Sequence, residues 1–390
     1  MKKIFFALLF SSVIYAQDIS FQSGTIREKN YYQEIPFEIV LKKIVIPVEI
    51  QNHTYHFILD TGAPNLISKK LMQTVNCKSL VKTPVRDANL TKDSLQVVQI
   101  PELQLGNLNF DNQIAIVSDL ENNPFLKCYE VDGLIGSNLF VNSILRINLK
   151  DKKITITDKI KNLDTHQKPK EMQLIGSQSK PCIWIEYQGN QNHKSKEQVV
   201  IDTGMDGFYD LSNRSYNYLK KEGIYQIIGK SKGVGEISLF GTGEAHEQEQ
   251  INIPNFKVNQ TTFTNVTTST HEDNSSRLGL DLFNYGTGIL DFKNKKFYWE
   301  SDNISQEMPK AEKYSATYYN NNFVTDYVWD SDLQTKIKAG DAIVRIDDKD
   351  TKNMTTCELL QLRDYMEDKK SYQMEVQKTD GTSVIVTINH

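Results

Sequence analysis

The stretch Phe57-Ile58-Leu59-Asp60-Thr61-Gly62-Ala63 decides how the rest of the chain is interpreted. Its apolar start, residues 57–59, is typical of a buried strand. The glycine at position 62 permits a tight turn directly after the acid. An aspartate at the end of a buried strand is costly unless it is paired, hydrogen-bonded or protonated. Asp60 therefore needs a partner elsewhere in the fold.

The same pattern returns 142 residues later (202 − 60), in Val199-Val200-Ile201-Asp202-Thr203-Gly204-Met205. One Asp-Thr-Gly is a weak signal, because three common residues recur by chance. Two copies, each after an apolar strand, favour a pair of aspartates that act together over two ordinary strand-to-turn exits. Two carboxyl groups held side by side share one proton, so one can act as general base while the other donates to a carbonyl oxygen.

The segments downstream of the two motifs also repeat. Residues 133–140 match residues 276–283, and the offset between their glycines, Gly136 and Gly279, is 143 (279 − 136). In each copy the glycine would let a short strand approach the aspartate loop closely. Repeats of this length indicate two duplicated lobes rather than a solenoid. The second copy departs from the first at Arg277, which stands where the first has leucine.

With these motifs the chain resembles the pepsin/retropepsin superfamily of aspartic peptidases. It is most similar to the two-lobed, retropepsin-like bacterial proteins that carry a C-terminal PDZ domain, and the resemblance covers nearly all of the chain after the leader. It implies a mainly β fold with two acid-protease lobes and a C-terminal α+β PDZ-like domain. We refer to residues 35–160 as the first lobe, 170–302 as the second lobe and 313–390 as the C-terminal segment. The polar residues 18–34 are expected to form a lead-in strand or arm.

The resemblance also assigns roles at the site. Asp60 and Asp202 would be the catalytic residues and would need no metal or cofactor. The hydroxyls of Thr61 and Thr203 would lock the two loops together. The turns that aim the acids would be formed by the motif glycines Gly62 and Gly204.

A flap hairpin is implied between the aspartate and the downstream glycine of each lobe. The second lobe offers the glycine-rich residues 233–244, with Gly241 and Gly243 as flap candidates, and such glycines permit closure over an extended substrate. A structural hairpin without substrate contact is the alternative. The first lobe has residues 86–99 at this place, without a glycine, so its flap is either rigid or missing.

The C-terminal segment follows a polar stretch, residues 303–313, that is typical of a linker. Its run 337–347 contains Gly-Asp-x-Ile-x-x-Ile and resembles the PDZ signature. A capping box from Thr355 to Glu358 predicts the start of a helix. PDZ domains bind extended peptides by adding a strand, but residues 318–322, at the place of the peptide-binding loop, lack glycine. The segment is therefore expected to pack on the lobes or to bind a peptide.

Composition and the N-terminus bear on where the protein works. The chain has 390 residues, is 39% hydrophobic and 24% charged, and carries a net charge of −4 without a basic run, which argues against nucleic acid as a partner. Residues 1–16 have the charged start, apolar core and small terminal residue of a signal peptide. Their apolar core is too short to span a membrane comfortably. We expect an exported protein, periplasmic or secreted, with no membrane span after signal removal.

The chain has four cysteines, Cys77, Cys128, Cys182 and Cys357. The first two lie in the same lobe and could form a disulfide in an oxidising compartment, with buried free thiols as the alternative. No cysteine pair has the spacing of metal ligands, and the histidines form no metal-binding motif. The sequence therefore predicts no metal site.

These observations predict an exported aspartic endopeptidase that hydrolyses an extended peptide or protein substrate in a site formed within one chain. The alternative is a catalytically inactive peptide-binding protein that retains the acid-protease fold. Met205 favours the alternative, because the family has a small residue directly after the motif, as Ala63 is in the first lobe. A bulky side chain there could crowd the water site or merely pack beneath it.

Overall fold

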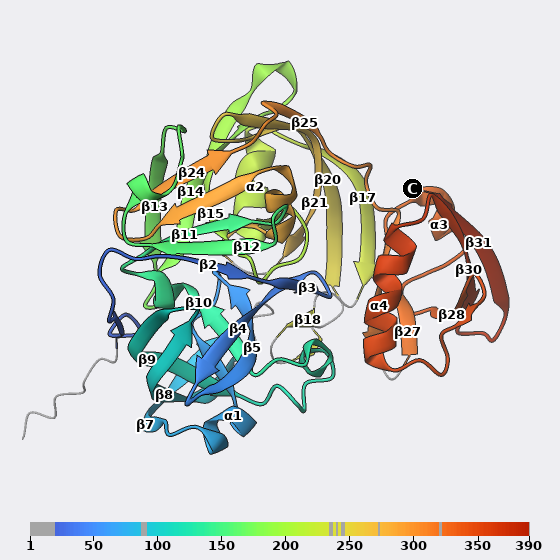
Figure 1. Ribbon diagram of the computed structural model, residues 1–390. Coiled ribbons are helices and arrows are strands. Elements are labelled where there is room, and N and C mark those ends of the chain that lie inside the picture. Colours follow the sequence, from blue (N-terminus) through green and yellow to red (C-terminus); the bar gives the residue numbers. More distant parts are fainter. Residues whose placement is uncertain are drawn as a thin grey trace, which may run out of the picture.

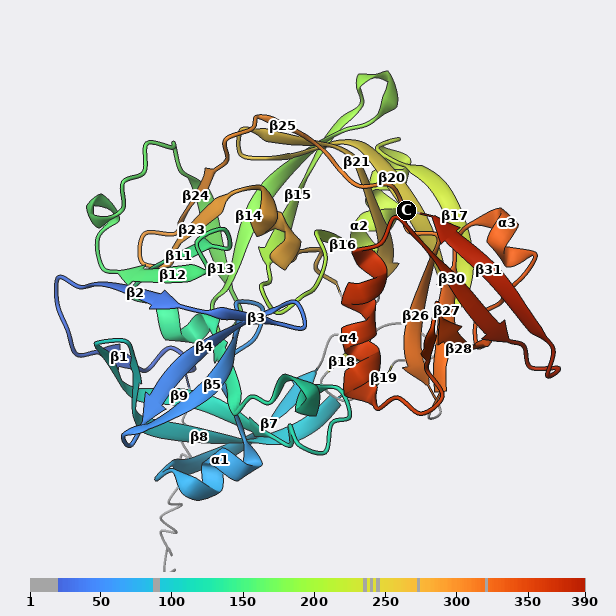
Figure 2. The ribbon, with the colours of Figure 1, turned by 45° about the vertical axis from the view of Figure 1, so that its right-hand side comes forward.

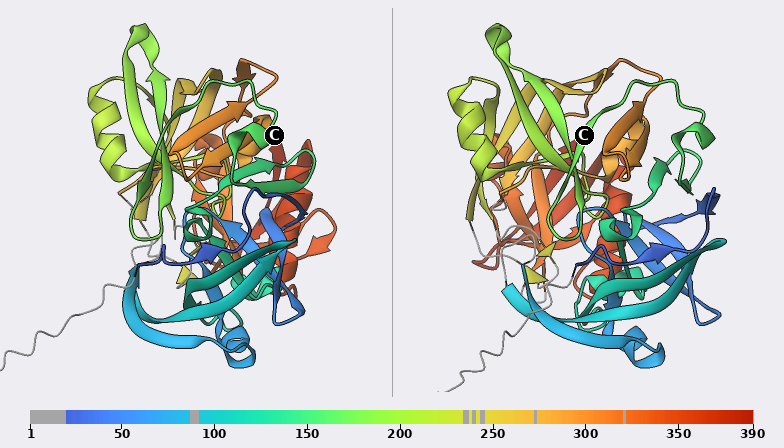
Figure 3. Two further views of the ribbon diagram at one scale, coloured as in Figure 1. Left: turned by 60° about the vertical axis from the view of Figure 1, so that its left-hand side comes forward. Right: turned by 90° about the vertical axis from the view of Figure 1, so that its left-hand side faces the viewer.

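The computed structural model describes residues 20–86, 92–233, 237–238, 241–242, 246–271, 274–319 and 322–389. The expected signal peptide and the flap candidate Gly243 lie outside these ranges. The described part is mostly β, which confirms the predicted fold class at that level (Figure 1). Two large sheets lie one above the other, and the C-terminal segment sits beside both of them (Figures 1 and 3).

The first sheet has the strand order β1-β9-β6-β10-β5-β4-β8-β7, with β3 added at β4. Its strands are β1 (Thr25–Ile26), β3 (Glu38–Val40), β4 (Lys43–Ile50), β5 (His53–Asp60), β6 (Leu66–Ser68), β7 (Lys78–Arg86), β8 (Lys92–Leu105), β9 (Leu108–Ser118) and β10 (Gly133–Gly136). The β4–β5 hairpin forms because Gln51 and Asn52 both adopt positive φ, the pattern of a tight hairpin turn. This hairpin delivers Asp60 to the end of a central strand.

The second sheet has the order β17-β20-β21-β16-β22-β15-β14-β13-β24-β23-β11-β12-β2, with β25 paired to β21. Its strands are β2 (Tyr32–Pro36), β11 (Ile144–Asn148), β12 (Lys153–Thr157), β13 (Lys170–Ile175), β14 (Lys180–Gln188), β15 (Lys194–Ile201), β16 (Tyr209–Ser212), β17 (Gln226–Gly233), β20 (His246–Val258), β21 (Thr261–His271), β22 (Arg277–Leu278), β23 (Thr287–Asp291), β24 (Lys296–Glu300) and β25 (Ser305–Glu307). Strands β2, β11 and β12 come from the first half of the chain, so this sheet joins the two lobes. The stretch expected to be a linker contributes strand β25.

One hydrophobic core runs through both lobes. It contains Phe57 and Leu59 on β5 and Val199 and Ile201 on β15, all of them almost fully buried. The apolar residues of these two strands are buried, as the pattern of their sequences predicts. Both aspartate-bearing strands are therefore anchored in a common interior, which fixes the two acids relative to each other.

Short helices connect the strands. The α-helices of the lobes are α1 (Lys69–Thr74) and α2 (Asn213–Lys221), and the 3₁₀ helices are η1 (Leu126–Tyr129), η2 (Ser137–Phe140), η3 (Ile160–Asn162), η4 (Asn190–Asn192) and η5 (Leu280–Tyr285). Both α-helices begin with a serine cap, Ser68 and Ser212, whose side chain accepts a hydrogen bond from the third residue of the helix. A small separate pair, β18 (Ile237–Ser238) and β19 (Gly241–Thr242), completes the second lobe.

The C-terminal segment has its own sheet and its own hydrophobic cluster. Its elements are β26 (Tyr314–Tyr319), β27 (Asn322–Val328), α3 (Ser331–Gln334), β28 (Ala342–Ile346), β29 (Lys349–Asp350), α4 (Thr356–Glu367), β30 (Ser371–Gln377) and β31 (Ser383–Asn389). The capping box predicted at Thr355 and Glu358 is confirmed, and α4 buries Leu359, Leu362 and Met366. Figure 2 shows α4 on the side of the segment that faces the lobes.

The cysteine pairing differs from the one weighed from the sequence. Cys128 on η1 forms a disulfide with Cys357 on α4, whereas Cys77 and Cys182 are free. The suggested bond between Cys77 and Cys128 was wrong, because the pairing is decided by packing between segments 229 residues apart. Packing of the C-terminal segment brings the Cα atom of Cys357 to 5.1 Å from that of Cys128, a normal disulfide distance. The segment is therefore covalently tied to the first lobe.

Candidate active site

The two Asp-Thr-Gly motifs form matching loops. Asp60 ends β5 and Asp202 directly follows β15. In each loop the glycine two residues on donates its N–H to the aspartate: Gly62 to Asp60 Oδ1 at 2.9 Å and Gly204 to Asp202 Oδ1 at 3.0 Å. These bonds orient both carboxyl groups.

The two threonines cross-link the loops. The Thr61 hydroxyl donates to the Ile201 carbonyl at 2.7 Å and accepts the Thr203 N–H at 3.1 Å. The Thr203 hydroxyl donates to the Leu59 carbonyl at 2.8 Å and accepts the Thr61 N–H at 3.1 Å. Both threonines are fully buried. Four hydrogen bonds of these two threonines thus run between the lobes.

The motif glycines keep the two acids close. A Cβ atom added at Gly62 would come within 2.5 Å of the Asp202 carboxyl group. One added at Gly204 would come equally close to the carboxyl group of Asp60. Each acid therefore packs against the turn of the other loop, in space that only a glycine leaves open.

The two carboxyl groups interact directly. Burial, together with the charge of Asp202 and a hydrogen bond to it, raises the pKa of Asp60 from 3.8 to about 7, and Lys43 opposes this rise. Two such groups cannot both ionise cheaply, so the pair retains one proton near neutral pH. This is the protonation state that acid–base catalysis by two carboxyls requires.

The two downstream glycines, Gly136 and Gly279, each lie against an aspartate loop. Gly136 is the residue of β10 opposite Asp60 in the parallel pairing with β5. An added Cβ atom would lie 2.3–2.5 Å from the backbone of residues 63–65. Gly279, which follows β22, would meet the carbonyl of Gly207 at 2.4 Å. Both glycines allow the close backbone contact that holds each aspartate loop in place.

A group of charges beside the second loop was not found from the sequence. Asp206 accepts hydrogen bonds from Lys43 of the first lobe and, at 2.9 Å, from Arg363 on α4. Lys43 also donates to the Gly204 carbonyl. Burial would raise the pKa of Asp206, but the two cations outweigh it and lower that pKa. The acid lies two residues after the second motif, yet nothing in the sequence reveals that residues 163 positions before it and 157 positions after it would reach it.

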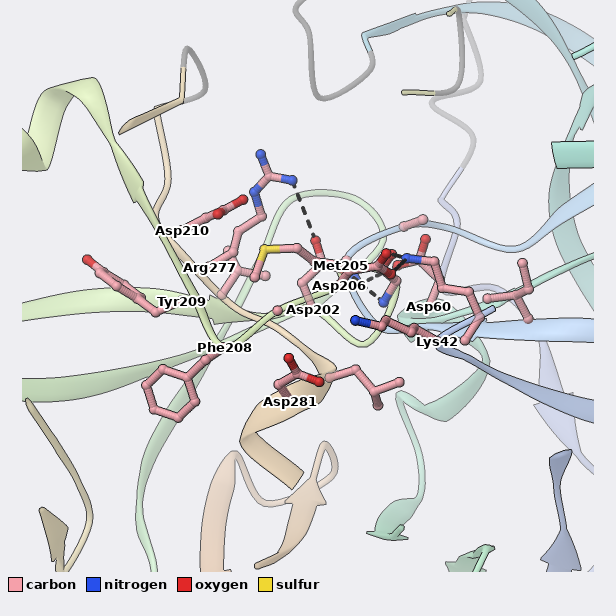
Figure 4. Close-up of a pocket in the computed structure, with 18 of the residues that line it drawn as sticks. Lys42, Asp60, Asp202, Met205, Asp206, Phe208, Tyr209, Asp210, Arg277 and Asp281 are labelled. Carbon is pink, nitrogen blue, oxygen red and sulfur yellow. Dashed lines mark hydrogen bonds and ion pairs between the residues drawn. The ribbon is translucent and has the colours of Figure 1, made fainter. Parts of the chain in front are cut away.

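Met205 does not point at the acids. Figure 4 shows its side chain extended toward Arg277, on the side away from Asp60. A Cβ atom added at Gly279 would lie 2.5 Å from the Met205 Cε atom. The side chain packs over this glycine at the wall of the cleft.

A cleft of about 1460 Å³ opens over the dyad and takes lining from both lobes and from the C-terminal segment. Residues 83–85 of β7 border it, so the first lobe does carry a hairpin at the place expected for a flap, with a tip outside the described residues. In the second lobe, Gly241 belongs to β19, which pairs with β18.

The described residues contain no group of three or more His, Cys, Asp or Glu side chains that could hold a metal ion. They also contain no helix long and apolar enough to cross a membrane. Asp60 and Asp202 both line the cleft, and each carboxyl group packs against the loop of the other. Such a pair can move protons to and from a water molecule and a carbonyl group.

Comparison with known proteins finds a matching family model and similar solved structures. Residues 46–139 match the model of a family described as aspartyl protease. The crystal structure of an aspartic proteinase from Irpex lacteus is similar over 70% of this chain and 97% of its own, at 11% identity and a TM-score of 0.42. No match was found among curated proteins. Over residues 46–139, which include the first motif and Gly136, the chain is similar to the aspartyl proteases.

Proposed function

We propose that this protein is an exported aspartic endopeptidase. The observation that carries the proposal is the paired arrangement of Asp60 and Asp202, each held by its own glycine and bound together by Thr61 and Thr203. The match of the first lobe to the aspartyl protease family supports it. No metal or cofactor takes part in the proposed reaction.

The proposed chemistry uses the shared proton. The ionised carboxyl takes a proton from water as the water oxygen attacks the peptide carbonyl carbon, and the protonated carboxyl donates to the carbonyl oxygen. The resulting tetrahedral species collapses when its nitrogen is protonated and the C–N bond breaks. Burial of the acids supports this reaction, because it keeps one of them protonated at a pH where free aspartate is ionised.

The proposed substrate is an extended peptide or an unfolded protein segment. The cleft has room for several residues, and residues 83–85 of the edge strand β7 at its border could pair with a substrate backbone. Both acids belong to one chain, so the site does not need a second subunit. The size and openness of such a cleft favour cleavage within a chain over removal of single terminal residues.

We also propose that the C-terminal segment is a PDZ-like domain and that the protein is periplasmic or secreted. The sheet, the helix α4 with its capping box and the separate core support the first proposal. The leader-like residues 1–16 support the second. The disulfide between Cys128 and Cys357 fits an oxidising compartment. Ligand recognition by the domain would then occur beside the catalytic cleft.

The test is cleavage by the purified chain beginning at Gln17. Incubation with a library of unstructured peptides across pH 3–8, followed by mass spectrometry, should reveal cleavage that is strongest at mildly acidic pH. Asp60→Asn and Asp202→Asn should each abolish it, whereas Asp281→Asn, which removes another carboxyl of the same cleft, should retain it. A statine-type transition-state mimic should raise the melting temperature of the unmodified protein.

Two results would contradict the proposal. Cleavage that persists in both Asn variants would exclude the dyad as its source. Absence of cleavage at every pH, with peptide still bound in the cleft, would favour the peptide-binding alternative.

A further inference from the structure

The two halves of the cleft differ at one pair of equivalent positions beside the acids. Leu134 on β10 and Arg277 on β22 each stand two residues before the glycine that contacts the aspartate loop. Each is also paired with an aspartate-bearing strand, Leu134 with Ile58 and Arg277 with Val200. The fold thus puts an apolar side chain on one side of the dyad and a cation on the other.

The neighbours of these two residues differ in the same way. On the next strand Leu134 is paired with Leu66, whereas Arg277 is paired with Asp210. All four side chains line the cleft. The two lobes therefore share the backbone pairing around the acids but differ in the charge of these side chains. The charged pair, Arg277 and Asp210, lines the cleft beside the acids.

Arg277 is aimed at one acid of the pair. Its Nη1 atom lies 3.9 Å from Oδ2 of Asp202, and both side chains are nearly nine-tenths buried, at 11% and 12% exposure. Figure 4 shows the guanidinium group directed toward Asp202, on the side away from Asp60. At this distance and depth, a cation favours the ionised form of a carboxyl group.

His271 holds the guanidinium group without cancelling its charge. Arg277 Nη2 donates to His271 Nδ1 at 3.2 Å. Burial and the charge of Arg277 lower the pKa of His271 to about 3, so the imidazole is neutral and can accept this bond. Its position at the end of β21 fixes the direction of the arginine.

Other charges lie near the dyad, and Lys43 among them is balanced by a partner of its own. Lys43 on β4 opposes protonation of Asp60, but its ammonium group is bonded to Asp206. Asp210 on β16 is the cross-strand neighbour of Arg277 and reduces its field without removing the contact with Asp202. The asymmetry between the acids therefore centres on the arginine.

We infer that Arg277 is a positioning residue that keeps the negative charge on Asp202 and leaves the shared proton on Asp60. This inference rests on the proposed function and assigns a separate role to each acid. Asp202 accepts a proton from the attacking water, and Asp60 gives its proton to the carbonyl oxygen. On collapse, Asp202 passes its proton to the leaving nitrogen and Asp60 recovers one from the tetrahedral hydroxyl, so the starting state returns.

The experiment titrates each carboxyl group alone. Protein labelled with ¹³C at the aspartate carboxyl carbon is prepared as Asp60→Asn and as Asp202→Asn, and each resonance is identified by its loss in the double variant. Arg277→Leu, which copies the residue of the first lobe, is then added to each. It should raise the titration midpoint of Asp202 by about one pH unit or more, the effect of a close opposite charge. The midpoint of Asp60 should move by less than half as much.

Two further variants serve as controls. Arg277→Lys keeps a cation and should keep the Asp202 midpoint within a few tenths of a unit of the arginine protein. Leu134→Ala, at the equivalent position, should move neither midpoint. A cooperative melt recorded for each variant shows that the fold is intact.

An unmoved Asp202 midpoint in Arg277→Leu, or a larger shift at Asp60, would overturn the inference. The titration needs no cleavage, so its outcome is separate from that of the proposed function. A shifted midpoint in a protein without hydrolytic activity would overturn the peptidase proposal and leave the charge assignment standing. An active enzyme whose Asp202 midpoint does not move in Arg277→Leu would overturn the charge assignment and leave the peptidase proposal standing.

Discussion

The four threonine bonds between the lobes allow a quantitative prediction. Thr203→Val replaces the hydroxyl with a methyl group of nearly the same shape. It removes the bond to the Leu59 carbonyl and leaves the Thr61 N–H without its acceptor, in a place where Thr203 itself is fully buried. Two buried polar groups left unpaired at about 1.5 kcal/mol each give a loss of about 3 kcal/mol in the free energy of unfolding.

Thr203→Ser is the matched control. It keeps the hydroxyl and loses one buried methyl group, which costs about 1 kcal/mol. Urea unfolding monitored by tryptophan fluorescence measures both variants, since Trp299 is fully buried in the core shared by the lobes. The valine variant should therefore be about 2 kcal/mol less stable than the serine variant, and kcat/KM should fall as the two loops lose their alignment.

The near-symmetry of the loops supplies a second control. Thr61 makes the equivalent pair of bonds, to the Ile201 carbonyl and from the Thr203 N–H. Thr61→Val and Thr61→Ser should thus reproduce the same difference. Equal stabilities of the valine and serine variants at both positions would refute the reasoning that these bonds hold the lobes together.

Three further predictions follow from the site and its surroundings. Asp60 has a folded pKa of about 7, above its unfolded value, so the protein loses stability as pH rises from about 4 to 7. Asp60→Asn should therefore gain up to about 4 kcal/mol in the free energy of unfolding relative to the parent across that range, and nothing below pH 4. A difference in urea unfolding that does not change with pH would contradict this. The Cys128→Ser/Cys357→Ser variant should lose roughly 2–5 kcal/mol and expose the C-terminal segment to limited proteolysis, whereas unchanged protection would show that the disulfide does not hold it. Met205→Ala should lower the melting temperature by loss of packing on Gly279 without increasing kcat/KM, and a gain in activity would restore the crowding explanation.

The features that could be predicted from the sequence are those that depend on local residue patterns or on the repeat between the two lobes. The apolar runs before Asp60 and Asp202 form strands, the capping box at Thr355 starts a helix, and Gly136 sits against the first aspartate loop. Each of these depends on residues close in the chain or on a repeated pairing of strands. The mainly β fold follows from the same signals.

What the sequence did not predict depends on contacts between distant segments. The bond between Cys128 and Cys357 spans 229 residues, and the network at Asp206 draws on both the first lobe and the C-terminal segment. No periodicity or motif specifies which surface of one domain will meet another. Arg277 was visible in the sequence as a departure from the repeat, but only its contact with the acid shows what it could do.

The central claim is that Asp60 and Asp202 work as one unit with a single proton. The most direct test is the dependence of kcat/KM on pH for a cleaved peptide, measured for the parent protein and for each Asn variant. The account predicts a bell-shaped profile for the parent, with an alkaline limb near pH 7, because activity requires one acid ionised and the other protonated. Both variants should show no activity at any pH. A profile with a single limb, or a variant that retains cleavage with the remaining carboxyl, would contradict it.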